Sequence, residues 1–114
     1  MKTVLQPLRD GREERSESMP AYFLIDIREI KHGAKMDEYR SRVAPTVEKF
    51  GGRYLVRGGP FKVVEGTYQP ARLAMLEFPS MDLARRWYDS EEYRELKQMR
   101  LAATVSNGFF MTGA

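Results

Sequence analysis

One carboxylate, Glu77, lies inside an otherwise apolar run, Leu73 to Phe78, that is typical of a strand. Burying a bare charge is costly, so this carboxylate must be paired, solvated or protonated. Side chains alternate between the two faces of a sheet, which places Glu77 on the same face as Leu73 and Met75. Glu77 is therefore the first candidate for a functional side chain.

Two further polar side chains are expected on the face of Glu77. In the predicted strand 22–30, one apolar face would pack on helices, which leaves Asp26 on the opposite face. Alternation along the predicted strand 53–57 places Arg57 on that face as well. The three side chains would then meet in one cavity with apolar walls, the usual form of a small-molecule site.

The chemistry of such a cavity would be that of a carboxylate and a guanidinium. Glu77 or Asp26 could act as a general base if burial raised its pKa, so both are predicted as catalytic candidates. Arg57 could bind an anionic or carbonyl-bearing ligand through its planar fork. The alternative is an arginine–carboxylate pair that only satisfies a dimer interface. Neither role requires a cofactor, and none is expected.

Tyr88 and His32 are further candidates for ligand binding. Tyr88 lies next to a predicted break between two helices, where its hydroxyl could reach the mouth of a cleft. His32 lies in a Lys-His-Gly turn and is the only side chain with an unperturbed pKa near neutrality. The alternative for His32 is an exposed turn residue. Trp87 and Tyr93 occupy helical core positions, which favours packing over chemistry.

Composition excludes several classes of site and partner. The 114 residues include no cysteine and one histidine, so no disulfide, thiolate site or multi-histidine metal centre can form within one chain. The net charge of +3 comes from basic residues interleaved with acidic ones, whereas nucleic-acid-binding faces cluster them. Apolar runs are far shorter than the roughly 20 residues that span a bilayer. We expect a cytoplasmic protein without metal, nucleic acid or membrane partners.

Hydrophobic periodicity predicts the elements that would position these residues. Strands are expected over 22–30, 53–57 and 72–78 and again near 109–111, and an amphipathic helix over 36–50. Pro45 should kink that helix, and Gly51-Gly52 should end it. Ser80 and Ser90 are the predicted N-caps of two successive helices. One face of the second carries Tyr93, Leu96, Arg100 and Ala103.

The order strand, helix, strand, strand, broken helix, strand predicts an α+β protein of the ferredoxin-like βαββαβ type. Its four-stranded antiparallel sheet would carry the helices on one face only. The other face would expose Leu24, Leu55 and Met75, so we expect a homodimer that covers this face in an α+β barrel. This single domain covers residues 19–114. Residues 1–18 are a polar extension, either a flexible tail or an arm that packs on a partner subunit.

Several motifs resemble the family called domain of unknown function 1330 (DUF1330), of the dimeric α+β barrel superfamily. They are Gly51-Gly-Arg-Tyr-Leu-Val-Arg-Gly-Gly59, Glu65-Gly66, Glu77-Phe-Pro-Ser80, Ala84-Arg-Arg-Trp-Tyr-Asp-Ser90 and Glu92-Tyr93. The resemblance covers residues 19–114 and implies a ferredoxin-like fold and a homodimer. The superfamily also includes antibiotic-biosynthesis-type monooxygenases. No mechanism transfers, because the family's activity is not generally established.

Two functions stay open at this point. The first is a dimeric small-molecule-binding protein or cofactor-free enzyme that uses the predicted cavity of Asp26, Arg57 and Glu77. The second is a non-catalytic structural or regulatory dimerisation module, in which the same charged cluster only sets the register of two subunits.

Overall fold

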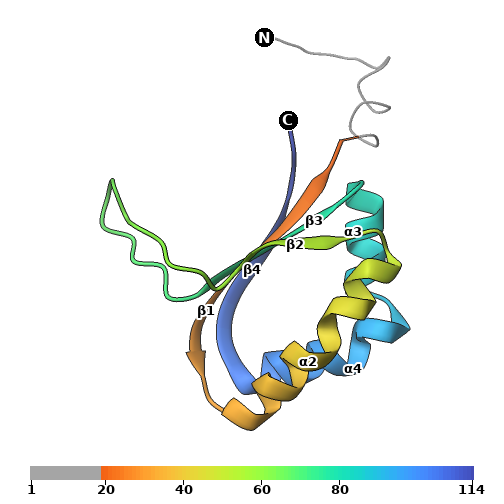
Figure 1. Ribbon diagram of the computed structural model, residues 1–114, viewed down its shortest axis with the longest axis horizontal. Helices are drawn as coiled ribbons and strands as arrows, with labels where there is room; N and C mark the ends of the chain where they lie inside the picture. Colours follow the sequence, from red (N-terminus) through yellow and green to blue (C-terminus); the bar gives the residue numbers. More distant parts are fainter. Residues whose placement is uncertain (1–18) are drawn as a thin grey trace.

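In the computed structural model, a four-stranded antiparallel sheet is covered by helices on one of its faces (Figure 1). The structure describes residues 19–114, so the predicted extension, residues 1–18, lies outside the described residues. The predicted ferredoxin-like order is confirmed, with the second helix divided in two. The elements are β1 (Ala21–Ile30), α2 (Gly33–Lys49), β2 (Arg53–Arg57), β3 (Leu73–Phe78), α3 (Met81–Tyr88), α4 (Glu91–Ala103) and β4 (Thr104–Thr112).

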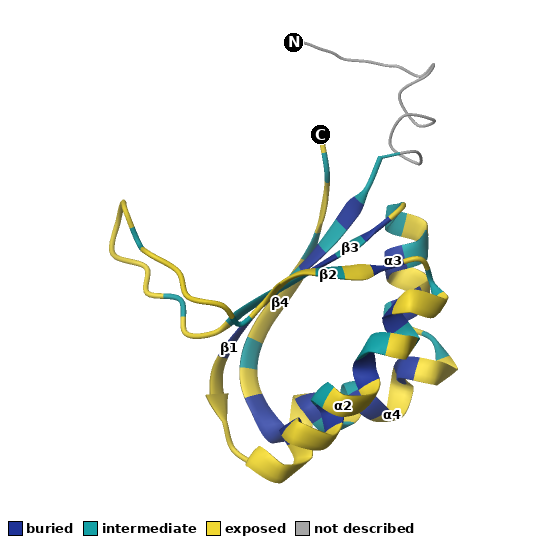
Figure 2. Ribbon diagram, viewed as in Figure 1, coloured by how far each residue is buried: buried dark blue, intermediate teal, exposed yellow. Residues whose placement is uncertain are grey.

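The strands lie in the order β2-β3-β1-β4, and every neighbouring pair is antiparallel. The central strand β1 alternates as predicted, with Phe23, Ile25 and Ile27 buried on the side of the helices. Figure 2 shows the helices turning their buried sides towards the sheet. The largest fully buried side chains are Trp87, Tyr93, Phe78, Met36, Val43 and Val47.

The helix boundaries follow the local signals of the sequence. Ser80 accepts a hydrogen bond from the backbone of Leu83 at 3.2 Å, and Ser90 accepts one from Tyr93 at 3.2 Å, so both predicted N-caps are confirmed. Gly51 has φ of 81° just beyond α2, a left-handed conformation that glycine adopts at low cost. Pro45 lies within α2, which continues through it as a single helix.

Strand β2 departs from simple alternation at Leu55, and this changes the face of the sheet to which Arg57 points. The register shifts between Tyr54 and Val56, so the strand holds one residue more than its partner, a β-bulge. The paired positions are Arg53 with Glu77, Tyr54 with Leu76, Val56 with Met75, and Arg57 with Ala74. Arg57 therefore turns to the helix-covered face, and the prediction that it shares the face of Glu77 is wrong.

The face without helices carries an apolar row that crosses the whole sheet. Its members are paired across neighbouring strands: Val56, Met75, Leu24 and Phe109. Val56 is 39% exposed and Phe109 is 51% exposed, so an apolar patch is present. It includes Leu24 and Met75 as expected, but Val56 takes the place predicted for Leu55, which lies at the bulge. We call it the open-face row. The neighbouring row is more polar and contains Arg53, Glu77, Tyr22 and Met111.

A long connection, residues 58–72, links β2 to β3 and projects away from the helices (Figure 1). Most of it is exposed (Figure 2). Its end is tied to β1, because the backbone N–H of Ile27 donates to the carbonyl of Arg72 at 2.8 Å. Within residues 19–114, no helix combines the length and apolar character that crossing a bilayer requires.

Candidate functional site

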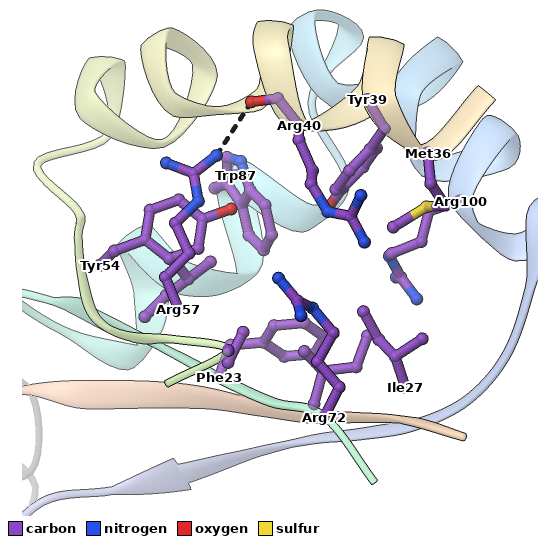
Figure 3. A pocket seen from close by; sticks show the side chains of 14 residues that line it. Phe23, Ile27, Met36, Tyr39, Arg40, Tyr54, Arg57, Arg72, Trp87 and Arg100 are labelled. Carbon is purple, nitrogen blue, oxygen red and sulfur yellow. Dashed lines mark hydrogen bonds between the residues drawn. The ribbon is translucent and has the colours of Figure 1, made fainter. Parts of the chain in front are cut away.

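A cavity of about 60 Å³ lies between the sheet and the helices (Figure 3). Apolar side chains of β1 and β3 and the aromatic rings of Phe23, Tyr39, Tyr54 and Trp87 form much of its wall. Its charged lining residues are Arg40, Arg57, Arg72 and Arg100. None of the residues that line it is an aspartate or a glutamate. The cavity is thus apolar in its walls and cationic in its polar groups.

Arg100 is the most deeply buried of these arginines, with 4% exposure. It lies on the inward face of α4, where Leu96 and Ala103 are also buried. Its Nε donates to the Tyr93 hydroxyl at 3.4 Å and its Nη1 to the Ser106 hydroxyl at 3.3 Å, both long contacts to neutral groups. Among residues 19–114, no carboxylate forms an ion pair with it. A buried cation with only neutral partners is costly, which marks this position as unusual.

Tyr39 lines the same part of the cavity and is 8% exposed. Its hydroxyl oxygen lies 2.6 Å from that of Tyr93, which also contacts Arg100. Burial raises the pKa of Tyr39 well above its ordinary value of 10.0, so the hydroxyl stays protonated near neutrality.

The mouth of the cavity is formed by arginines from the ends of the neighbouring strands. Arg57, turned inwards by the bulge, donates from Nη2 to the backbone carbonyl of Arg40 at 2.9 Å, and its guanidinium carbon lies 4.2 Å from the centre of the Tyr54 ring. The Arg72 guanidinium lies against Gly58, where a Cβ would come within 2.6 Å of it. Figure 3 shows Arg40 reaching down from α2, Arg72 rising from the sheet and Arg100 entering from α4.

Asp26 lies on the other face of the sheet, where it holds the end of the 58–72 connection. Its Oδ1 accepts from the backbone of Ala71 at 2.9 Å and of Arg72 at 3.1 Å. Its Oδ2 accepts from Arg28 at 2.7 Å and from the Tyr68 hydroxyl. Burial alone would raise the pKa of Asp26, but these hydrogen bonds outweigh it and lower the pKa to about 2.

Glu77 lies on the open face and finds its partners within the chain. Its Oε1 accepts from Arg53 Nε at 2.9 Å, and its Oε2 accepts from the Tyr22 hydroxyl at 3.3 Å. Desolvation, followed by the charge of Glu77, raises the pKa of Tyr22. Neither Glu77 nor Asp26 lines the cavity that Arg57 enters, so the predicted three-residue cluster is not formed. The catalytic roles of the two carboxylates stay predictions.

Tyr88 and His32 also lie outside the lining of this cavity. The Tyr88 ring contacts Phe23 at a centroid distance of 5.7 Å, and the Lys97 ammonium lies 4.2 Å from its centroid. His32 is exposed at the start of α2 and its side chain makes no capping hydrogen bond. In the described range, 19–114, no group of three histidine, aspartate or glutamate side chains could hold a metal ion.

The sequence contains a signal for Arg100 as a functional residue. Tyr93, Leu96 and Ala103 share one helical face with Arg100, which makes it a charge in an apolar stripe. Glu77 is the same kind of residue in its strand, a charge within an apolar run. Arg57 was predicted as a ligand-binding residue but on the opposite face, because the bulge redirects it. No comparable signal marks Arg72 or Tyr39, because the helix–sheet packing places them.

Comparison with known proteins identifies one family and several solved structures of similar fold. The family model described as "Domain of unknown function (DUF1330)" matches residues 20–114. Among curated proteins, none matches the chain.

Three solved structures resemble the chain in fold. The RPA0582 protein of unknown function from Rhodopseudomonas palustris is 17% identical, with a TM-score of 0.68, and the match covers 96% of this chain and 95% of that one. SnoaB, a cofactor-independent oxygenase from Streptomyces nogalater, is 13% identical, with a TM-score of 0.58 and coverage of 84% and 94%. A dimeric ferredoxin-like protein of unknown function from Thermobifida fusca is 10% identical, with a TM-score of 0.52 and coverage of 84% and 92%. At these identities the likeness shows the fold alone.

Proposed function

The chain belongs to the DUF1330 family, and from that premise we propose that it binds a small organic anion in the arginine-lined cavity. The observation that carries this proposal is Arg100, a guanidinium with 4% exposure and no carboxylate partner among residues 19–114. Proteins normally pair such a charge, and removing one partner of a buried pair is strongly destabilising. An anionic ligand would supply the missing partner.

The other lining residues fit the same kind of ligand. Like charges that converge on one space repel one another, and the repulsion is stronger away from water. A bound anion relieves it, and the planar guanidinium of Arg57 is already oriented by Arg40 and Tyr54. The apolar and aromatic walls suit the organic part of the ligand.

The test is calorimetric titration with a panel of small carboxylates, with benzoate as the first probe. The variants Arg57→Gln and Arg100→Gln should each weaken binding about tenfold or more, because a hydrogen bond to a charged group contributes about 1.5–3 kcal/mol. The control is Arg94→Gln, which removes a 65% exposed arginine from the same helix as Arg100 and should leave binding unchanged. If all three variants bind benzoate with the affinity of the native protein, the proposed site is refuted. If Arg100→Gln fails to fold, Arg57→Gln still decides, because its side chain lies at the exposed mouth.

We further propose that the protein acts as a homodimer. The open-face row has no cover within residues 19–114, and a stable apolar surface of this kind is normally an interface. The dimeric ferredoxin-like protein from Thermobifida fusca shows that the fold accommodates pairing. Light scattering should give twice the chain mass for the native protein and one chain mass for Phe109→Glu. Leu101→Glu, a 53% exposed position on α4, is the matched control and should stay dimeric.

The enzymatic form of the proposal is cofactor-free catalysis, for which SnoaB offers a precedent in fold. Its proposed catalytic bases are Glu77 and Asp26, which lie on the open face of the sheet and not in the arginine-lined cavity. The second candidate function is the dimerisation module, which the Glu77–Arg53 pair on the open face favours. The variant Glu77→Gln distinguishes the enzymatic form from the dimerisation module. A shifted monomer–dimer balance supports the module, and an altered benzoate response supports a role at the ligand site.

A further inference from the structure

The hydrogen bonds among Arg100, Tyr93 and Tyr39 have a direction. A guanidinium only donates hydrogen bonds, so the Arg100 Nε–H donates to the Tyr93 oxygen. Tyr93 is completely buried, and the one acceptor within reach of its hydroxyl proton among the described residues is the oxygen of Tyr39, at 2.6 Å. Tyr39 lines the cavity, so its proton can point into that space, whereas Tyr93 is not among the lining residues. If Tyr39 donated instead, the Tyr93 proton would be enclosed without an acceptor, which costs about 1–3 kcal/mol. This difference favours donation from Tyr93 to Tyr39.

This direction leaves the proton of Tyr39 free. No second partner of its hydroxyl is found among residues 19–114, and the side chain lines the cavity (Figure 3). Arg100 likewise keeps N–H groups beyond the two that bind Tyr93 and Ser106, since a guanidinium has five. Both residues contact the same Tyr93 hydroxyl, so their unused donors lie at one end of the cavity.

We infer that Tyr39 and Arg100 together bind the carboxylate group of an aromatic carboxylate, with Tyr39 as a hydrogen-bond donor to one of its oxygens. The inference rests on the proposed function and names its ligand class. A carboxylate is an acceptor-only group, which matches an end of the cavity that offers only donors. The ring of the ligand would lie among Phe23, Tyr54 and Trp87, whose faces and edges line the remaining wall.

The chain from Arg100 to Tyr39 also strengthens that donor. Donation from a cation polarises the Tyr93 hydroxyl, and hydrogen bonds in such a chain reinforce one another. Tyr93 is held in place by its stacking on Trp87, with 4.1 Å between the ring centroids. Tyr39 is therefore a ligand-binding residue and Tyr93 a positioning residue.

The experiment compares benzoate with toluene, which has a similar shape but neither charge nor acceptor. Calorimetric titration of Tyr39→Phe should show benzoate affinity reduced about tenfold or more, while the affinity for toluene stays within about twofold. The substitution keeps the ring and removes only the hydroxyl. Tyr88→Phe is the matched control, since Tyr88 belongs to the same aromatic cluster but lies outside the cavity, and it should change neither affinity.

The outcomes separate this inference from the proposed function. If the native protein binds none of the carboxylates in the panel, both the proposed function and this inference are refuted. If the native protein binds benzoate and Tyr39→Phe binds it equally well, only the inference is refuted. An equal loss for benzoate and toluene would mean a packing role for Tyr39 and would also refute it. Should Tyr39→Phe fail to fold, Tyr93→Phe replaces it, with a weakened preference for benzoate over toluene expected and an unchanged preference contradicting the inference.

Discussion

Replacing Asp26 by asparagine should destabilise the protein in a way that depends on pH. The carboxylate accepts hydrogen bonds from the backbone of Ala71 and Arg72 and from the side chains of Arg28 and Tyr68. Asparagine keeps an acceptor for the two backbone groups but places an amide, without charge, towards Arg28. We expect Asp26→Asn to lose most of the stabilisation that the charge contributes at neutral pH.

The size of this contribution follows from the pKa. The hydrogen bonds lower the pKa of Asp26 from its ordinary value of 3.8 to about 2 in the folded protein. A lowered pKa stabilises the fold when the group is ionised, so the contribution is complete above a pH of about 5 and is lost as the pH falls through 3.8 towards 2. The difference between the two pKa values corresponds to about 2 kcal/mol, of which about 1 kcal/mol is lost at pH 3.

Urea unfolding of the native protein and of Asp26→Asn at pH 6 and pH 3 measures this contribution. All samples have one protein concentration, because the stability of the proposed dimer would depend on it. Asp26→Asn should be about 2 kcal/mol less stable at pH 6, and the gap should narrow by about 1 kcal/mol at pH 3. Asp37→Asn, at a side chain with 79% exposure, controls for the general effect of losing an aspartate. A gap that is the same at both pH values would refute the assignment of the charge to this cluster of hydrogen bonds.

Three further predictions concern packing, capping and ligand entry. Gly52→Ala should lower stability by about 1–3 kcal/mol in thermal unfolding, since its Cβ would come within 2.6 Å of the Phe78 ring, and an unchanged melting temperature would contradict this packing. Ser90→Ala should lower the free energy of unfolding in urea by about 1 kcal/mol and Ser90→Gly by less, because both remove the N-cap hydrogen bond from the Tyr93 backbone. Equal stability of the native protein and both variants would contradict a stabilising role of this N-cap. Trp87 is the single tryptophan, is fully buried and lines the cavity, so benzoate should change its fluorescence, and a binding event without such a change would place the ligand elsewhere.

The fold was predictable because its signals are local. The caps at Ser80 and Ser90 and the helix end at Gly51 each depend on a few neighbouring residues, and each is present in the structure. The alternation of β1 was equally clear, because Phe23, Ile25 and Ile27 all face one core. These features require no knowledge of which element packs on which.

The site was less predictable because it depends on a single irregularity. Strict alternation places Arg57 on the same face of the sheet as Glu77, but one extra residue at Leu55 inverts every side chain that follows it. Neither a glycine nor a proline marks this bulge in the strand 53–57. The direction of Arg57, and with it the composition of the cavity, therefore follows from the pairing of β2 with β3 and not from the sequence of β2.

Glu77 and Arg100 are the same kind of anomaly, a charge in an apolar element, and they resolve differently. Glu77 remains 23% exposed in its side chain and is paired with Arg53, so the chain itself neutralises it. Arg100 is 4% exposed and has only hydroxyl partners among residues 19–114, so its charge stays uncompensated. Exposed pairs contribute little and require no ligand, whereas an unpaired buried charge is retained at a cost in stability. That cost is the physical reason to place the functional site under the helices, at Arg100, instead of on the open face at Glu77.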